Sequence, residues 1–331
     1  MHRGRHLYRV AELDEPVPGP GQAAIRVAYA GVQWGDILVR DGHFPVPRPF
    51  VPGFGAAGHS VAVGAGVDPA RIGERVAALT TAGACAVVVV APAVLALDIG
   101  DLPLRTAAGI GWGAPTAYDL VSTAARVRPG ESVLIHAAAG SVGTLAAQFA
   151  RPAGAGRIVG VAGSAARAGY AARFGYDEVL LCEELPAGLG EQAFDVILDA
   201  VGGPTRQDGL GRLAPHGRLV AYGNPGGFGP VLADADDLLA QGKSLLTCTS
   251  HLLARTGPER LADSARRAIR LIADGRVRVD ITAEYELTDL SAAVRRLADG
   301  STHGTSVLRV ARVARAARGP GPSLIARVGG S

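Results

Sequence analysis

The N-terminal part of the chain shows the period-two alternation that is typical of short β-strands. Apolar and polar positions alternate over Ala23–Ala30, and further short apolar runs lie at 61–63, Arg75–Leu79 and Cys85–Val90. Glycine and proline separate these runs at close intervals, as in PVPGPGQ and PVPRPFVPG. Such spacing predicts a small β-barrel or sandwich.

The next part of the chain alternates between strand-like and helix-like segments. Helical patterns such as TAYDLVSTAARV and AARAGYAARFG stand between short apolar runs. These runs predict strands at 132–135, 157–161, 178–181, 194–199 and 218–222. Alternation of this kind predicts a parallel sheet with right-handed crossovers.

The C-terminal part returns to a different pattern. A long helix is expected over 258–275, and TAEYEL, LSAAVRRLADG and SVLRV predict a strand, a helix and a closing strand. Residues 312–331 are basic and contain several Gly and Pro residues. This composition predicts a flexible tail, with a partner-binding segment as the alternative.

Composition limits the kinds of partner to expect. A chain of 331 residues with 48% hydrophobic and 19% charged residues indicates a globular protein of two domains. Its net charge is only +3, and acidic and basic residues are mixed along most of the chain. Nucleic acid is therefore not an expected partner, because its binding needs a clustered basic face.

The cysteines and the apolar runs bear on location. Cys85, Cys182 and Cys248 lie far apart and form no CxxC pair, which favours a reducing compartment. The start MHRGRHLYRV lacks the apolar core of a signal peptide. The longest apolar run, 86–97, is interrupted by Pro92 and is too short to span a bilayer. We expect a soluble, cytoplasmic protein with no membrane contact.

The segment HAAAGSVG follows a predicted strand and precedes a predicted helix. Gly140 and Gly143 match two glycines of the dinucleotide fingerprint, while Ala138 stands at the position of the first. Gly140 would let the backbone approach a pyrophosphate, and Gly143 would let the helix pack closely on the strand. The N–H groups of Ser141 and Val142 would face the phosphates. This context predicts dinucleotide binding, with a plain helix-entry turn as the alternative.

The residues after the second strand of this region favour NADPH over NADH. An NAD site places Asp or Glu there to hold the ribose hydroxyls, but none occurs from Ile158 to Tyr176. Ser164 and Arg167 are available instead to contact a 2′-phosphate. In the alternative interpretation, Arg167 is a solvent-facing helix residue.

Several motifs in order resemble one known family. They are VPGPGQAAIRVAYAGVQWGDILVRDGHFP, FVPGFGAAGHSVAVGAGV, IGERVAAL, AAGIGWGAPTAYDLV, VRPGESVLIHAAAGSVGTLAAQFA, FDVILDAVGG and LAPHGRLVAYGN. In these stretches the chain resembles the zinc-independent quinone oxidoreductase branch of the medium-chain dehydrogenase/reductase superfamily, which includes polyketide-type enoyl reductases. The resemblance covers residues from about 10 to 310.

The resemblance implies an α/β fold of two domains. A GroES-like, β-rich catalytic domain would comprise residues 1–115 and 256–311, and a doubly wound Rossmann domain that binds NADP would comprise 116–255. The tail would be 312–331. It also implies a homodimer, in which the edge strand predicted at Leu245–Ser250 would pair with its copy.

The resemblance also implies the absence of a metal site. Zinc-containing relatives place ligands at the positions of Gln33, Phe54, Gly55 and Trp112. None of these residues is a Cys, a His or an acid. A tetrahedral zinc site cannot be assembled from them.

The function implied is hydride transfer from NADPH to a quinone or an α,β-unsaturated carbonyl compound, without zinc. Gln33, Trp34 and Asp36 would line the substrate side, and Tyr118 is a candidate proton source. The cofactor would be bound by residues around the turn, by those at the adenosine end and by others near its nicotinamide. These residues are Thr116, Gly140, Ser141, Val142, Gly143, Ser164, Arg167, Gly223 and Asn224.

Four positions depart from the family pattern. Phe44 and Cys182 stand where a Tyr is common, Gly55 replaces an acidic residue, and Thr305 replaces a Lys. These departures keep three alternatives open. They are a polyketide-tailoring enoyl reductase, a non-redox cyclase on the same scaffold, and a nucleotide-binding relative without catalysis.

Overall fold

The computed structural model describes residues 8–44, 46, 50–227, 229–310 and 323–328. The chain forms two units. One contains Gly113–Leu252 and Gly275–Arg278, and the other contains the described residues before Gly113, Leu253–Asp274, and those from Val279 onward. The middle unit thus begins at Gly113 rather than 116 and ends at Leu252 rather than 255.

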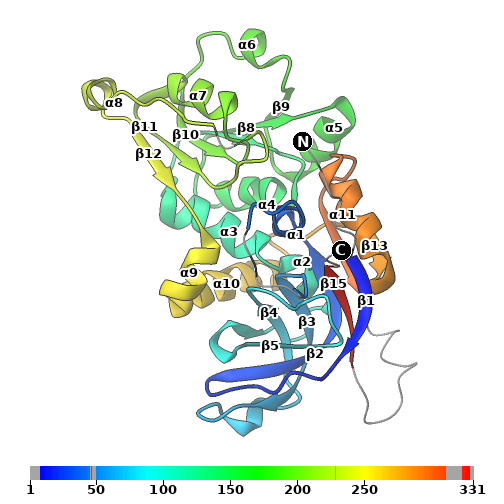
Figure 1. The fold of residues 1–331 in the computed structure, drawn as a ribbon. Coiled ribbons are helices and arrows are strands. Elements are labelled where there is room, and N and C mark those ends of the chain that lie inside the picture. The colour runs from blue at the N-terminus through cyan, green and yellow to red at the C-terminus, as the bar shows by residue number, and fades with distance from the viewer. Residues whose placement is uncertain (1–7, 45, 47–49, 228, 311–322, 329–331) are drawn as a thin grey trace. The chain divides into compact units, whose positions relative to one another are not determined.

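The Gly113–Leu252 unit is built on a parallel sheet with helices packed against it (Figure 1). Among the described residues the strand order is β12-β11-β10-β7-β8-β9, which is the Rossmann order. Its strands are β7 (Ser132–His136), β8 (Arg157–Ala162), β9 (Glu178–Leu181), β10 (Phe194–Asp199), β11 (Leu213–Ala221) and β12 (Ser244–Thr247). Its helices are α3 (Gly113–Asp119), α4 (Ser141–Ala150), α5 (Ala165–Ala171), α6 (Leu185–Gly188), α7 (Pro204–Gly211) and α8 (Ala235–Gln241).

The central strands β7 and β8 form where apolar residues follow one another, as in VLI and IVGVA. Leu134, Val159, Phe194, Ile197 and Leu219 are fully buried in one core cluster. Continuous apolar runs are expected in strands that are covered on both faces. The prediction of a parallel sheet is therefore confirmed.

Two details of this unit differ from the prediction. β11 begins at Leu213, not at 218, because Leu213 pairs with Phe194 before the register shifts and Arg218 pairs with Val196. α8 was not predicted, since all but one of its residues are exposed and the helix has no buried apolar face.

The second unit is rich in β-structure, as the alternating pattern predicts. Its main sheet has the order β13-β14-β2-β3-β4-β6, and β5 also pairs with β2. The strands are β1 (Tyr8–Leu13), β2 (Gln22–Val32), β3 (Gly55–Val63), β4 (Arg75–Leu79), β5 (Val88–Pro92), β6 (Ala96–Asp98), β13 (Ile281–Glu286), β14 (Thr305–Arg309) and β15 (Ser323–Val328). The helices are α1 (Trp34–Arg40), α2 (Leu104–Ile110), α10 (Pro258–Ala273) and α11 (Leu290–Ala298). The chain crosses between the units within α9 (Ser250–Thr256).

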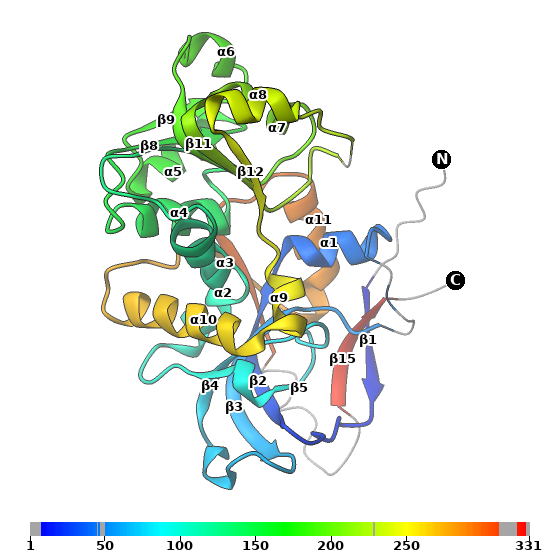
Figure 2. The same ribbon diagram turned by 90° about the vertical axis from the view of Figure 1, so that its left-hand side faces the viewer.

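The predicted tail contains a strand. β15 pairs antiparallel with β1 along its whole length, from Tyr8 opposite Val328 to Leu13 opposite Ser323 (Figure 2). The prediction of a flexible tail is therefore wrong for 323–328, because backbone pairing with a distant strand orders it. Residues 311–322 and 329–331 lie outside the described part of the chain. No helix in the described ranges is long and apolar enough to cross a membrane.

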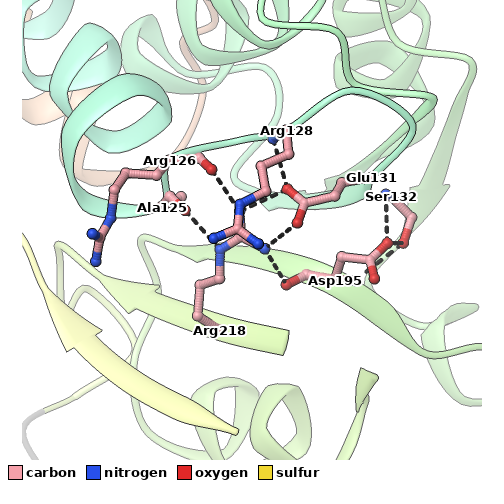
Figure 3. A network of polar contacts seen from close by, with 7 residues as sticks. All are labelled: Ala125, Arg126, Arg128, Glu131, Ser132, Asp195 and Arg218. Atoms are coloured by element: carbon pink, nitrogen blue, oxygen red, sulfur yellow. Dashed lines mark hydrogen bonds and ion pairs between the residues drawn. The ribbon is translucent and has the colours of Figure 1, made fainter. Parts of the chain in front are cut away.

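A network around Arg218 fastens the amino-terminal ends of the parallel strands (Figure 3). The Arg218 guanidinium donates to both carboxylate oxygens of Glu131 at 2.7 Å and to the carbonyl oxygens of Ala125, Arg126 and Asp195. Burial acts to raise the pKa of Glu131, but the Arg218 hydrogen bonds outweigh it and lower that pKa. These contacts link β11 to the segment that leads into β7.

Replacing Arg218 with methionine is expected to lower the free energy of unfolding by about 3 kcal/mol, because Glu131 is then left mostly buried without its partner. Urea unfolding followed by circular dichroism measures the change. Arg266→Met is the matched control, since Arg266 pairs with Asp263 on the exposed surface. It should change stability by less than about 0.5 kcal/mol. Equal effects of the two substitutions would contradict the role given to this network.

Candidate cofactor site and active-site residues

The turn between β7 and α4 brings two backbone segments into direct contact. α4 begins at Ser141 with Gly140 as its N-cap. A Cβ atom on Gly143 would lie 2.5 Å from the carbonyl oxygen of Ala137 and 2.9 Å from the Cα atom of Ala138. Side chains do not tolerate such distances, so the first turn of α4 packs here only because residue 143 is glycine.

The buried Tyr176 holds this turn in place by a hydrogen bond. The Tyr176 hydroxyl donates to the carbonyl oxygen of Gly143 at 2.8 Å and lies 3.4 Å from that of Ala138. Its ring fits because Gly160 leaves space, where a Cβ atom would be 2.9 Å from the ring. Burial raises the pKa of Tyr176 well above its usual value, so the hydroxyl remains a donor. No local pattern in the sequence indicates Tyr176, because it lies 33 positions beyond Gly143.

The geometry of the turn fits a pyrophosphate. The first N–H groups of α4, at Ser141, Val142 and Gly143, have no partner within the helix. They point from a helix amino terminus, where the helix dipole favours an anion. The absence of a side chain on Gly140 and on Gly143 lets the start of α4 pack against the backbone of Ala137, which sets these N–H groups at the end of β7.

The residues predicted for the adenosine end gather after β8. Ser164 is the N-cap of α5, and its hydroxyl accepts the N–H of Arg167 at 3.4 Å. A Cβ atom on Gly163 would lie 3.8 Å from Nη1 of Arg167, so the guanidinium lies near the end of β8. Burial raises the pKa of the Cys182 thiol, and Arg167 acts in the opposite direction, so these two side chains are within electrostatic reach.

Thr116 lies on α3, whose amino terminus is beside that of α4. A Cβ atom on Gly113 would lie 2.5 Å from Oγ of Ser141, so the two helices touch there. The hydroxyl groups of Thr116 and Ser250 are 2.8 Å apart and form a hydrogen bond. Ser250, at the start of α9, was not predicted as a neighbour of this site.

The structure does not bring Tyr118 to the turn. Its ring packs edge-on against Phe149, with 5.6 Å between the ring centroids. Phe149 is eight residues along α4 from Ser141, which corresponds to about 12 Å of helix. The Tyr118 ring therefore lies against α4 near Phe149 and not at the turn.

Gly223 and Asn224 follow β11 and are both held by one arginine. Nη2 of Arg206 donates to the carbonyl oxygen of Gly223 at 2.6 Å and to Oδ1 of Asn224 at 3.0 Å. Nε of Arg206 pairs with the buried carboxylate of Asp199 at 2.6 Å. Neither Arg206 nor Asp199 was predicted from the sequence as a neighbour of this site.

In the β-rich unit, Asp36 is a structural residue rather than a substrate contact. Its side chain is fully buried, and its two oxygens accept the N–H groups of Gln33 at 2.9 Å and Gly53 at 3.0 Å. Burial raises the pKa of Asp36 to about 7, although these two hydrogen bonds act in the opposite direction. The carboxylate fastens the start of α1 to the segment before β3.

Gln33, the N-cap of α1, and Trp34, its first residue, differ in how far they are buried. Nε2 of Gln33 is buried and has no hydrogen-bond partner among the described residues. It lies among glycines, since Cβ atoms on Gly55 and Gly111 would be 3.2 Å and 2.9 Å from it. Trp34 is 37% exposed, which leaves its ring accessible.

The residues at the positions of zinc ligands in relatives do not fit a zinc ion. The indole N–H of Trp112 donates to the carbonyl oxygens of Phe54 and Thr80. Gln33 offers only an amide, and Gly55 has no side chain. The described part of the chain contains no group of three His, Cys, Asp or Glu residues that could hold a metal.

Comparison with known proteins defines the class. Residues 19–125 match the alcohol dehydrogenase GroES-like domain, and residues 141–266 match the zinc-binding dehydrogenase domain. Quinone oxidoreductase of Salmonella typhimurium is 31% identical over 319 residues, which cover 93% of this chain and 97% of that protein. The structure of Escherichia coli quinone oxidoreductase complexed with NADPH has a TM-score of 0.80 and 28% identity, covering 92% of this chain and 99% of that one.

A second kind of relative is much longer. Phthioceranic/hydroxyphthioceranic acid synthase of Mycobacterium tuberculosis is 29% identical over 313 residues, or 91% of this chain. The chain spans only 14% of the length of that synthase. Fold and comparisons together define a two-domain protein with GroES-like and Rossmann parts. The chain belongs to the quinone oxidoreductase branch of the medium-chain dehydrogenase/reductase superfamily.

Gly143→Ala is expected to weaken dinucleotide binding at least about tenfold, because the new methyl group must displace the backbone of the turn. Calorimetric titration with NADPH measures the dissociation constant of each variant. Gly169→Ala on α5 is the control, since a Cβ atom there meets nothing within 4 Å. Unchanged binding in the Gly143 variant would show that the turn does not hold the dinucleotide.

Asp36→Asn is expected to remove a pH dependence of stability. The folded pKa of about 7 is above the unfolded value near 3.9, so Asp36 contributes stability that is complete below about pH 4 and is lost as the pH rises through 7. The difference in unfolding free energy between wild type and variant should therefore fall over this range. Urea titrations at several pH values measure it, and a difference independent of pH contradicts the raised pKa.

Proposed function

We propose that this protein is a zinc-independent oxidoreductase that uses NADPH to reduce a quinone or an α,β-unsaturated carbonyl compound. The observation that carries the proposal is the glycine contact of the β7–α4 turn, which opens a helix amino terminus to a pyrophosphate. The complex of the Escherichia coli quinone oxidoreductase with NADPH supports the choice of cofactor.

The end of β8 supports NADPH rather than NADH. The segment from Ile158 to Tyr176 contains no acidic residue that would repel a 2′-phosphate. Ser164 and Arg167 lie there with a hydroxyl and a guanidinium. A guanidinium makes short, charge-assisted hydrogen bonds to phosphate, so Arg167 is the proposed partner of the 2′-phosphate.

NADPH supplies the hydride when it is bound, so the chain's own residues bind and orient. The N–H groups of Ser141 and Val142 would hold the pyrophosphate, and Thr116 would lie near the nicotinamide. In the β-rich unit, Gln33 is a proposed acceptor residue, and its amide would have to turn from its buried position to donate to a carbonyl oxygen. The exposed ring of Trp34 would stack on a planar acceptor.

The second candidate is an enoyl-thioester reductase, which the similarity to the mycobacterial synthase favours. Reduction of an enoyl thioester needs a proton at the α-carbon, and quinone oxygens can take protons from water. Tyr118 packs against Phe149, and Phe44 has no proton to donate. These residues support a quinone over an enoyl thioester as the acceptor, because a reduced quinone takes its protons on oxygen.

The edge strand β12 supports the proposal of a homodimer. β12 is the outer strand of the described Rossmann sheet, and three of its four residues are exposed, Leu245 among them. An uncovered edge strand can pair with a copy of itself. Sedimentation of the purified protein gives its mass and tests this proposal.

Arg167→Ala is expected to weaken NADPH binding by about 10- to 100-fold and to leave NADH binding nearly unchanged, because only NADPH carries the 2′-phosphate. Calorimetry with both nucleotides measures the two affinities. An equal loss of affinity for NADPH and NADH would show that Arg167 does not bind the 2′-phosphate.

Turnover separates the candidate functions once NADPH binding is established. A reductase oxidises NADPH in the presence of a benzoquinone or a crotonyl thioester, and the faster acceptor identifies the class. A cyclase would change its substrate without consuming NADPH. A relative without catalysis would gain thermal stability from NADPH and show no turnover.

A further inference from the structure

We propose that Arg206, held by Asp199, is a positioning residue that orients Asn224 toward the nicotinamide half of the bound dinucleotide. In this orientation, the Asn224 amide N–H groups would donate to an oxygen of the nicotinamide ribose or carboxamide. The inference rests on the proposed function, because it assumes that NADPH binds at the carboxyl ends of the strands.

The position of Asp199 in the sheet places it at the ligand-binding edge. β10 pairs with β7 in parallel, with Leu198 opposite Ile135, so Asp199 and His136 end these two strands side by side. The strand order reverses between β7 and β10, with β8 and β9 on one side and β11 and β12 on the other. Ligands of such sheets bind outside the carboxyl ends at this switch point.

Asp199 is fixed by several donors. Its carboxylate is fully buried and accepts the N–H groups of Val201 at 2.8 Å and Gly202 at 3.1 Å, together with Nε of Arg206 at 2.6 Å. Burial lowers the pKa of the neighbouring His136, while Asp199 and Asp208 act to raise it. Because a neutral His136 imidazole carries no charge, Arg206 is the cation that pairs with the Asp199 carboxylate.

Arg206 then connects two loops. From α7, its Nη2 group donates to the carbonyl oxygen of Gly223 at 2.6 Å and to Oδ1 of Asn224 at 3.0 Å. One guanidinium can serve three acceptors in this way because its donors form a rigid planar fork. The loop after β11 is thereby tied to the end of β10.

The bond to Oδ1 determines how the Asn224 amide is turned. Because Oδ1 faces Arg206, the Nδ2 group faces away from it. Nδ2 donates to none of the described residues, and Asn224 is only half-buried. Gly202 contributes the space, since a Cβ atom there would lie 3.1 Å from Oδ1 of Asn224. Two amide hydrogens are therefore presented to a ligand at this edge.

The test compares Arg206→Lys with Arg218→Lys. A lysine can keep the charge pair with Asp199 but cannot also reach Gly223 and Asn224, because it lacks the fork. Arg218 is an equally buried fork at the opposite ends of the strands, so its variant reports the structural effect alone. We expect Arg206→Lys to weaken NADPH about tenfold and Arg218→Lys to leave NADPH binding unchanged.

Binding of 2′,5′-ADP provides the local readout. This fragment lacks the nicotinamide half, so Arg206→Lys and Asn224→Ala should bind it as the wild type does while both bind NADPH more weakly. In the Asn224→Ala background, Arg206→Lys should cause no further loss, because it acts through Asn224. The Asn224→Ala variant also keeps the proposal testable if Arg206→Lys does not fold.

Three results overturn the inference. Equal NADPH affinity of Arg206→Lys and wild type does so, as does equal weakening of 2′,5′-ADP and NADPH. Additive losses in the double variant would show that Arg206 does not act through Asn224. If the wild type binds no NADPH at all, the proposed function fails, and this inference fails with it. That result differs from the three above, in which the wild type binds NADPH.

Discussion

The contact between Gly143 and the Ala137 carbonyl is the constraint on which the candidate site depends. It lets α4 start directly against the end of β7, so the helix amino terminus and its N–H groups lie at the carboxyl edge of the sheet. Tyr176 holds the same turn by a hydrogen bond to Gly143. A larger residue at 143 would move the helix, and the anion-binding geometry would be lost with it.

Two buried arginines, Arg218 and Arg206, lie at opposite ends of the parallel strands. Arg218 donates hydrogen bonds to Glu131 and to several carbonyl oxygens at the amino-terminal ends of the strands, where it stabilises the fold. Arg206 pairs with Asp199 at the carboxyl ends, where loops must be held in a set orientation. Both use the guanidinium fork to join segments that are far apart in sequence. The same chemistry therefore supports the fold at one edge and holds the loops of the proposed binding surface at the other.

In the β-rich unit, Trp112 and Gln33 are held by packing and backbone contacts. Trp112 donates to backbone carbonyls, and the Gln33 amide lies among glycines where relatives have ligands. Asp36, a nearby carboxylate, is committed to two backbone N–H groups.

The sequence alone determined the strand–helix alternation, the glycine turn and the absence of an acid after β8, because each depends on residues close together in the chain. It could not determine that Tyr176 fixes the turn, that Arg206 holds Asn224, or that Tyr118 faces Phe149. These are contacts between elements distant in sequence, and no local pattern encodes them. Pairing of β15 with β1 is of the same kind. Only the tertiary structure decides which side chains meet, because packing and hydrogen bonding are satisfied across the whole fold.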